Sequence, residues 1–314
     1  MRPFAERDYA AYSRIYSLGE GVRVTPESAR VYDERWEWAR YEKVRVVAVD
    51  EEDVPVGFGE IYHEPSRFEP PRYFVRLGVE PRLRRRGIGR AIWEHLAAEL
   101  DERGAQVACL WARDHTACID FLAARGFREI VRSYRMVLAV ASAPLPTPAT
   151  RERLAQGGVR IATLASLASS DADALSKAHA LHTESRLDQP TLGRVSAISY
   201  EAWRAYNVDD SLAIPDAYFV AVAGETYVGQ CTAGRSPASE DVLEIGVTAV
   251  RPEFRRRGTG RALKLELHAF ARGRGFREIH TNTASENTAM VGLNTKLGYA
   301  IVESSGGYEL TLGS

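Results

Sequence analysis

The chain has 314 residues, of which 45% are hydrophobic and 26% are charged, and its formal net charge is −1 at pH 7. This length suits two domains better than one, and a nearly neutral chain gives no global field toward nucleic acid or a membrane surface. Its three cysteines fit neither a disulfide framework nor a zinc pattern. The N-terminus lacks a signal-peptide core and no apolar run could span a bilayer, so we expect a cytoplasmic monomer or homodimer.

The first half of the chain is expected to alternate strands with helices. A strand-like run, YFVRLGV, occupies 73–79 and leads into an amphipathic helix with apolar residues at every fourth position from Ile88 to Leu100. This helix should stop near Gly104. A strand at 106–112 and a helix that closes on ARGF follow.

A proline-rich stretch, ASAPLPTPAT, occupies 141–150 between the two halves. Three prolines among small residues disfavour helix and strand, so this stretch is predicted to be a linker. RERLAQ can add a helical turn before the strand VRIATL. We place the domains at 1–140 and 158–314, with a linker at 141–157.

The second half repeats the pattern of the first. Early strands are predicted at 218–223 and 227–233, followed by a strand at 243–250. An amphipathic helix, a strand at 278–283 and a helix that closes on KLGY complete the series. Runs of strands mixed with helices predict an α/β fold with a mixed sheet and helices on both faces in each copy.

A duplicated motif is the strongest signal in the chain. VEPRLRRRGIGRA at 79–91 and VRPEFRRRGTGRA at 250–262 align without a gap, at an offset of 171 residues. In each copy R-x-x-G-x-G stands between a strand and a helix. Closely spaced glycines allow a ligand to approach the backbone, and the following helix offers free N–H groups and a positive dipole end. The motif therefore suits a pyrophosphate, with arginines adding charge-assisted contacts.

Other phosphate motifs fit the chain less well. A dinucleotide fingerprint needs a third glycine where Ile92 and Leu263 stand, and a P-loop needs a G-K-[ST] that is absent. A nucleic-acid arm would show a wider basic patch with interleaved aromatic residues. The remaining alternative is an exposed, arginine-rich helix start, which the duplication makes less favoured.

At these residues the sequence resembles the GNAT family of N-acetyltransferases, and the resemblance covers the chain twice over. It implies two tandem GNAT domains that use acetyl-CoA as co-substrate and no metal. It also implies that the fourth strand splays from the fifth at a bulge and pairs with the pantetheine arm of the coenzyme. The implied coenzyme-binding residues are Thr248, Ala249, Val250, Arg255, Arg256, Arg257, Gly258, Thr259, Gly260, Arg261 and Asn287, and, in the first copy, Leu77, Val79, Arg84, Arg85, Arg86, Gly87, Ile88, Gly89 and Arg90.

The resemblance also implies a catalytic base. Acyl transfer needs a neutral amine, and an alkyl amine with a pKa near 10 is neutral in only about one molecule in 10³ at pH 7. The family position for a glutamate, six residues before the motif valine, holds Glu244. The alternative is an exposed glutamate at the start of a strand. By the same count the first copy holds Tyr73, so the second copy is expected to carry catalysis.

The chain departs from the family at the position of the general acid. The family's usual tyrosine position holds Asn294 in the second copy and Leu122 in the first, and asparagine is no proton source at neutral pH. Tyr308 or water could replace it. Asn287 matches a frequent coenzyme-contacting asparagine and can equally be a helix N-cap, whereas the first copy has His115 there.

We therefore expect an acetyl-CoA-dependent N-acetyltransferase that acts on a primary amine of a small molecule in a ternary complex. The alternative is a catalytically impaired acyl-CoA-binding or regulatory protein, and a nucleic-acid binder is a remote third. Asp188 could recognise a cationic amine, although a turn or cap role is favoured. His179 and His182 have helical spacing without a third ligand, so we expect no metal.

Overall fold

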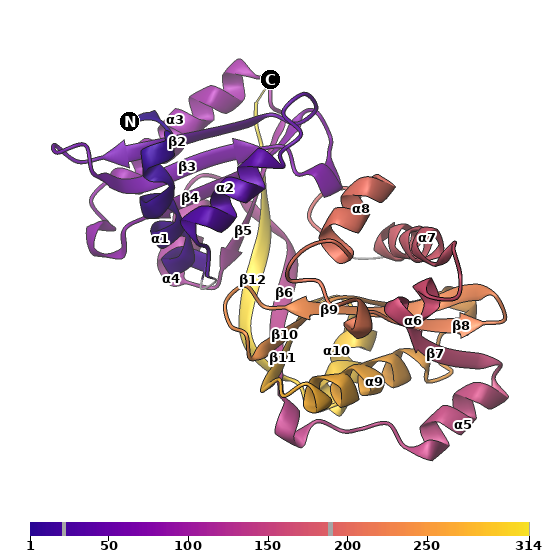
Figure 1. The fold of residues 1–314 in the computed structure, drawn as a ribbon. Helices are drawn as coiled ribbons and strands as arrows, with labels where there is room; N and C mark the ends of the chain where they lie inside the picture. The colour runs from indigo at the N-terminus through magenta and orange to yellow at the C-terminus, as the bar shows by residue number, and fades with distance from the viewer. Residues whose placement is uncertain (21–22, 188–190, 314) are drawn as a thin grey trace. The chain divides into compact units, whose positions relative to one another are not determined.

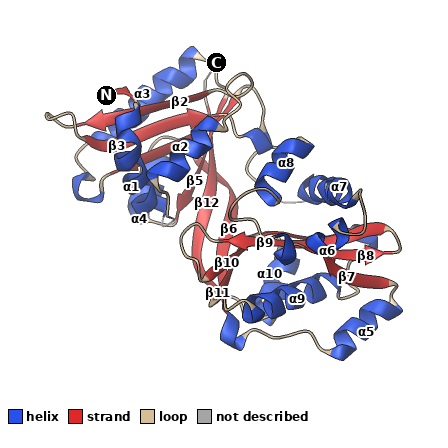
Figure 2. Ribbon diagram, in the orientation of Figure 1, coloured by secondary structure: helices blue, strands red, loops and turns tan. Residues whose placement is uncertain are grey.

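The computed structural model describes residues 1–20, 23–187 and 191–313, and these form two compact units (Figure 1). The first unit consists of 1–131, 192–196 and 305–314, and the second consists of 132–191 and 197–304. Each unit has a sheet with helices on both faces (Figure 2), so the predicted α/β fold with a mixed sheet is confirmed.

The first unit has the strand order β1-β2-β3-β4-β5-β12. Its strands are β1 (Arg2–Pro3), β2 (Lys43–Val49), β3 (Pro55–Tyr62), β4 (Arg72–Val79), β5 (Val107–Arg113) and the last part of β12 (Ala300–Thr311). Its helices are α1 (Tyr9–Glu20), α2 (Pro26–Glu34), α3 (Ile88–Glu102) and α4 (Thr116–Ala123). Apolar residues of α1 and α2 pack on one face of the sheet, and those of α3 and α4 pack on the other.

The second unit has the corresponding order β7-β8-β9-β10-β11-β6. Its strands are β6 (Arg128–Ala139), β7 (Val159–Thr163), β8 (Phe219–Ala223), β9 (Thr226–Arg235), β10 (Val242–Val250) and β11 (Glu278–Ala284). Its helices are α5 (Pro148–Gln156), α6 (Leu164–Ala168), α7 (Ala174–Leu187), α8 (Tyr200–Asn207), α9 (Thr259–Gly273) and α10 (Thr288–Lys296). Helices α6 to α8 pack on one face of the sheet, and α5, α9 and α10 on the other.

The strands of each unit include one that comes from the other half of the sequence. In the first unit β12 pairs antiparallel with β5, from Ser305 opposite Arg113 to Thr311 opposite Val107. In the second unit β6 pairs antiparallel with β11, and Ala139 lies opposite Glu278. The compact units therefore do not coincide with the predicted domains at 1–140 and 158–314. We keep those domain bounds as a proposed division of the sequence into two homologous copies.

The residues between the copies pack against the second unit. Helix α5 occupies most of the stretch from 148 onward, and Leu154 is buried in the core beside α9. Pro144 accepts a hydrogen bond from His268 Nδ1 at 3.0 Å, and His268 Nε2 accepts one from the hydroxyl of Tyr299 at 3.0 Å. Burial lowers the pKa of His268 to about 4, so this histidine is neutral at pH 7. The neutral ring satisfies both of its nitrogens inside the unit.

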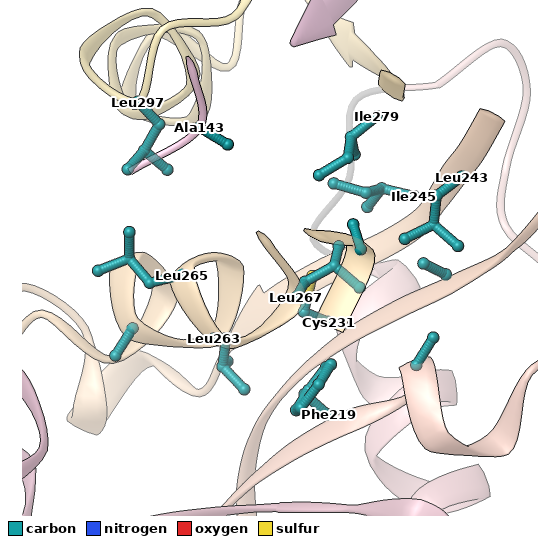
Figure 3. Packing of buried hydrophobic residues seen from close by; sticks show 14 of the residues in the cluster. Ala143, Phe219, Cys231, Leu243, Ile245, Leu263, Leu265, Leu267, Ile279 and Leu297 are labelled. Atoms are coloured by element: carbon teal, nitrogen blue, oxygen red, sulfur yellow. The ribbon is translucent and has the colours of Figure 1, made fainter. Parts of the chain in front are cut away.

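The main core of the second unit lies between its sheet and α9 (Figure 3). Leu263, Leu265 and Leu267 contribute from the helix, and Leu243, Ile245 and Ile279 from the strands. Lys264 lies on the same helix and is fully buried. Its Nζ has no hydrogen-bond partner among the described residues and stands 5.2 Å from the centroid of the Tyr299 ring. Burial therefore lowers the pKa of Lys264 below its usual 10.5.

Replacing Lys264 by Met is expected to raise the free energy of unfolding at pH 7 by about 1–3 kcal/mol, since a buried amine without a partner costs about that much. The folded state loses the lysine proton at a lower pH than the unfolded state does. The penalty is therefore present at neutral pH and shrinks as pH rises toward 10.5. Urea unfolding of both proteins at pH 7 and pH 9.5 would measure this. A Met variant that is less stable at pH 7 would contradict the assignment.

Candidate active site

The duplicated motif forms the same turn in both units. Helix α9 begins after Gly258, which has a φ of 85°, and Arg256 two residues earlier has a φ of 61°. In the first unit Gly87 and Arg85 have φ values of 86° and 63° before α3. The first N–H groups of each helix have no partner within the helix. Each turn therefore presents free backbone donors at the positive end of a helix dipole, as an anion requires.

Nothing in the protein itself requires the last glycine of each motif. Gly260 lies inside α9 without a positive φ, and a Cβ built there would come no closer than 3.6 Å to any other group. Gly89 in the first unit has the same freedom, with a nearest approach of 3.6 Å. A glycine that neither backbone strain nor packing demands fits a surface that a ligand approaches closely. The turns thus have the geometry that holding a diphosphate requires.

The motif arginines surround these turns, and most of their side chains are exposed. Arg255 Nε donates to the carbonyl of Val250 at 2.8 Å, and Arg84 Nε donates to that of Val79 at 3.2 Å. These two arginines therefore fasten each turn to the end of the preceding strand. The others that lie exposed on the turns and first helical residues are Arg85, Arg86, Arg90, Arg256, Arg257 and Arg261.

The fourth strand of each unit separates from the fifth. In the second unit the parallel pairing of β10 with β11 ends at Ile245 opposite Thr281, although β10 stays paired with β9 as far as Val250. In the first unit the pairing of β4 with β5 ends at Phe74 opposite Cys109. The later residues of each strand thus have one edge that pairs with no strand among the described residues, as an extended ligand arm requires. Those residues include Thr248, Ala249 and Val250, and Leu77 and Val79 in the first unit.

A β-bulge distinguishes the two units. In the second unit the register between β10 and β9 shifts by one residue, so that Gly246 and Val247 both lie opposite Thr232. The hydroxyl oxygen of Thr232 accepts a hydrogen bond from the Val247 N–H at 2.9 Å. In the first unit β3 and β4 pair without any shift, from Gly57 opposite Val79 onward. The bulge implied by the family resemblance is therefore present in the second unit and absent from the first.

Glu244 lies on β10 just before the bulge, with 34% of its side chain exposed. Its Oε1 accepts hydrogen bonds from the Ser236 hydroxyl at 2.7 Å and from Arg135 Nη2 at 3.5 Å. Its Oε2 contacts no polar group of the described residues. Glu244 therefore has one fixed oxygen and one that is open to accept a proton.

Arg135 connects Glu244 to a histidine. Its Nη2 also donates to His280 Nδ1 at 2.8 Å, and His280 Nε2 lies 2.7 Å from Glu278. Because Nδ1 accepts from a guanidinium, the ring proton is assigned to Nε2, which donates to the carboxylate of Glu278. Glu244 and His280 lie opposite each other on β10 and β11, and Arg135 comes from β6. A charged network thus crosses three strands on one face of the sheet.

The structural counterpart of Glu244 in the first unit is Phe74. Glu244 pairs with His280, and the equivalent pair is Phe74 with Cys109. The extra residue of the bulge moves the correspondence one position away from Tyr73, so the count from the motif valine was wrong there. Tyr73 instead packs in the core and donates from its hydroxyl to Glu42 at 2.8 Å. The first unit therefore has an apolar ring where the second has a carboxylate.

The remaining candidates are not gathered around Glu244. Asn294 is fully buried, and its Nδ2 donates to Thr283 at 3.1 Å and faces the sulfur of Met136. Since Arg135 and Met136 are successive strand residues, Glu244 and Asn294 lie on opposite faces of the sheet. Leu122 is buried in the core of the first unit.

Tyr308 lies on β12 in the first unit and is buried there, opposite Leu110 of β5. Its hydroxyl donates to Glu129 at 3.2 Å. Asn287 caps α10 by accepting from the N–H of Met290 at 3.1 Å, whereas His115 makes no such cap at α4. The cap leaves the amide nitrogen of Asn287 available to a ligand.

Two further sequence candidates have other positions. His182 is buried, which lowers its pKa to about 4, and His179 Nε2 bonds the carbonyl of Ile198 at 3.0 Å. Asp188 lies outside the described residues. Within the described ranges, no cluster of three or more metal-ligating side chains occurs, and no helix is long and apolar enough to cross a membrane.

Comparison with known proteins shows the family and the fold. The model of the acetyltransferase (GNAT) family matches residues 10–127 and 181–299. Mycothiol acetyltransferase of Thermobispora bispora is 31% identical over 77% of this chain and 76% of its own length, and that of Thermobifida fusca is 30% identical over 82% and 79%.

Solved structures share the fold. A GCN5-related N-acetyltransferase from Sphaerobacter thermophilus has a TM-score of 0.73 at 18% identity and covers 99% of this chain and 94% of its own. A tandem GNAT protein from the clavulanic acid biosynthesis pathway has a TM-score of 0.70 at 17% identity, covering 100% and 98%. Both similarities concern the fold, which here contains two copies of one domain.

Proposed function

We propose that this chain, which belongs to the GNAT family of acetyltransferases, transfers an acetyl group from acetyl-CoA to a primary amine of a small molecule, and that its second unit carries out the transfer. The observation that supports this most is the asymmetry of the fourth strands. Only β10 combines a bulge, a free edge and a carboxylate, whereas β4 has neither bulge nor carboxylate. The first unit keeps its phosphate turn, so we assign it coenzyme binding without transfer.

Each part of the second unit has a role in this proposal. Acetyl-CoA supplies the activated acetyl group. The N–H groups after Gly258 hold its diphosphate, and the free edge of Thr248 to Val250 aligns the pantetheine arm. Val247 cannot stabilise the oxyanion because Thr232 already binds its N–H, so this role falls to an N–H of Thr248 to Val250.

Glu244 acts as the base, directly or through one water molecule. It accepts a proton from the acceptor amine at Oε2, while Ser236 and Arg135 hold Oε1. The amine nitrogen then forms a bond to the acetyl carbon, the carbon–sulfur bond breaks, and the nitrogen releases its second proton to solvent to give the neutral amide. The departing thiolate takes a proton from solvent, since a thiol with a pKa near 8.5 needs little assistance. No step is assigned to Asn294 or Tyr308.

The acceptor is proposed from the relatives. Their name, mycothiol acetyltransferase, points to the unacetylated form of mycothiol as the first acceptor to test. Release of the coenzyme thiol should be followed with acetyl-CoA, this acceptor and a panel of simple amines and amino acids. Amine-dependent thiol release, with acetylated amine in stoichiometric amount, supports the proposal. Coenzyme binding by calorimetry without turnover of any amine would instead support an acyl-CoA-binding protein.

Replacing Gly260 by Ala is expected to weaken acetyl-CoA binding at the second unit by at least about tenfold, because the new Cβ would occupy the path of the diphosphate. Stability should change by less than about 1 kcal/mol, because the Cβ meets only ordinary contacts in the protein. Calorimetric titration with acetyl-CoA measures the first effect and thermal unfolding the second. Gly273→Ala at the end of the same helix, where no group lies within 4 Å, is the matched control. Equal affinities of the two variants would refute the assignment of the turn.

A further inference from the structure

The guanidinium of Arg135 is only partly used by the protein. Its one engaged nitrogen, Nη2, is shared between Glu244 Oε1 at 3.5 Å and His280 Nδ1 at 2.8 Å. Its Nε and Nη1 have no hydrogen-bond partner among the described residues, and 24% of the side chain is exposed. A guanidinium is always charged and presents its five N–H groups in a fixed fork. Arg135 therefore offers unused donors beside the open oxygen of Glu244.

The position of the Arg135 side chain is fixed by its hydrogen-bond partners and by its strand. His280 is fixed by Glu278, and the carboxylate of Glu244 is fixed by Ser236, so both partners of Nη2 have defined positions. Residues of β6 carry Arg135 into the sheet, where Asn282 is its cross-strand partner. A side chain anchored through one nitrogen in this way points its remaining donors reproducibly.

We propose that Arg135 recognises an oxygen of the acceptor that is carried by the carbon adjacent to the amine-bearing carbon, so that the acceptor has an α-amino carbonyl or α-amino carboxylate group. This inference rests on the proposed transfer at Glu244 and adds the acceptor class to it. In such a group the nitrogen and the oxygen are about 3 Å apart. The side chains of Arg135 and Glu244 are neighbours, because Nη2 and Oε1 lie 3.5 Å apart, so one such group can contact both of them. The amine then donates its proton to Glu244 Oε2, while the acceptor oxygen accepts hydrogen bonds from Nε and Nη1 of Arg135.

A purely structural Arg135 would behave differently. If the guanidinium only held Glu244, its removal would slow transfer to every amine by the same factor. If it also binds an acceptor oxygen, its removal slows transfer more to acceptors that carry that oxygen than to acceptors without it. For each amine, we compare kcat/KM of the wild type with kcat/KM of the variant. The ratio of the two values separates the two roles, because the intrinsic reactivity of the amine cancels in it.

The test uses the full chain with Arg135→Leu and Arg135→Lys, and with Arg128→Leu as the matched control at an exposed position of the same strand. The acceptors are unacetylated mycothiol, glycinamide, glycine and ethylamine. The rate of each reaction is measured as thiol release from acetyl-CoA. We expect Arg135→Leu to lower kcat/KM for the oxygen-bearing acceptors by about 10–100-fold more than for ethylamine, mainly through KM. The loss for ethylamine measures how much Arg135 contributes by holding Glu244. Arg135→Lys should restore part of the loss, and Arg128→Leu should match the wild type.

The outcomes decide between the sources of the oxygen. A larger loss for glycine than for glycinamide assigns a free carboxylate, and the reverse assigns a carbonyl; either result supports the proposal. Equal losses for all four acceptors would overturn it while leaving the transferase function intact. Wild-type protein that transfers to no amine would overturn the proposed function and this inference together.

Discussion

Replacing Glu244 by Gln is expected to lower kcat for amine acetylation by about 10²–10⁴, the usual contribution of a general base. The amide keeps the shape of the side chain and an oxygen that can accept from Ser236 and Arg135. It cannot take a proton at the position of Oε2. Acetyl-CoA affinity should stay within about twofold, because the diphosphate and the pantetheine arm bind elsewhere. Thiol release at saturating acceptor and calorimetric titration measure the two quantities.

The matched control is Glu225→Gln, which makes the same change at an exposed turn of the second unit. Its turnover should equal that of the wild type. A rise in pH should also rescue Glu244→Gln, because a larger fraction of the amine is then already neutral. Unchanged kcat in Glu244→Gln at pH 7 would remove this carboxylate as the base.

Replacing Tyr308 by Ala is expected to destabilise the first unit by about 3–5 kcal/mol, as removal of a buried aromatic ring does. Tyr308 is 6% exposed and packs in the core formed by Tyr73, Leu122 and Phe127. Its residue number places it near the end of the sequence, but its strand completes the sheet of residues 1–131. Hydrogen exchange should therefore accelerate in β4 and β5, more than 190 residues earlier in the chain.

Thr311→Ala on the same strand is the control, because its side chain is exposed. Exchange in β8 to β10 of the second unit should change little in either variant. If Tyr308→Ala accelerated exchange only within β10 and β11, the strand would belong to the second unit and the exchange of strands described above would be incorrect.

The sequence alone was sufficient for the parts that repeat. The two G-x-G turns, the strands before them and the helices after them were predicted from local pattern and are found at the expected residues. Their conformation follows from glycine chemistry: Gly87 and Gly258 both adopt a positive φ that other residues disfavour. Such features depend on neighbours in the sequence, so a duplicated motif can reveal them.

The parts that depend on distant residues could not be predicted in this way. The last strand of each copy, β6 or β12, pairs with a strand of the other copy. The local sequence of β6 and β12 does not determine which strand each one pairs with. Arg135 was missed for the same reason, because it lies in the first half of the sequence but belongs to the second unit. The bulge left one signal, since Gly246 interrupts an apolar strand, and an isolated glycine there suggests a bulge. That signal would also have moved the counterpart of Glu244 from Tyr73 to Phe74.

The exchanged strands also set an order of events during protein synthesis. When residues 1–131 have left the ribosome, the edge of β5 still lacks the strand that will cover it, because residues 305–311 are translated much later. At about 5–20 residues per second this edge stays open for roughly 10–40 s. An unpaired strand edge is a template for association with other chains. The unpaired edge of β5 is therefore most in need of protection by chaperones after the first unit has been synthesised and before residues 305–311 follow.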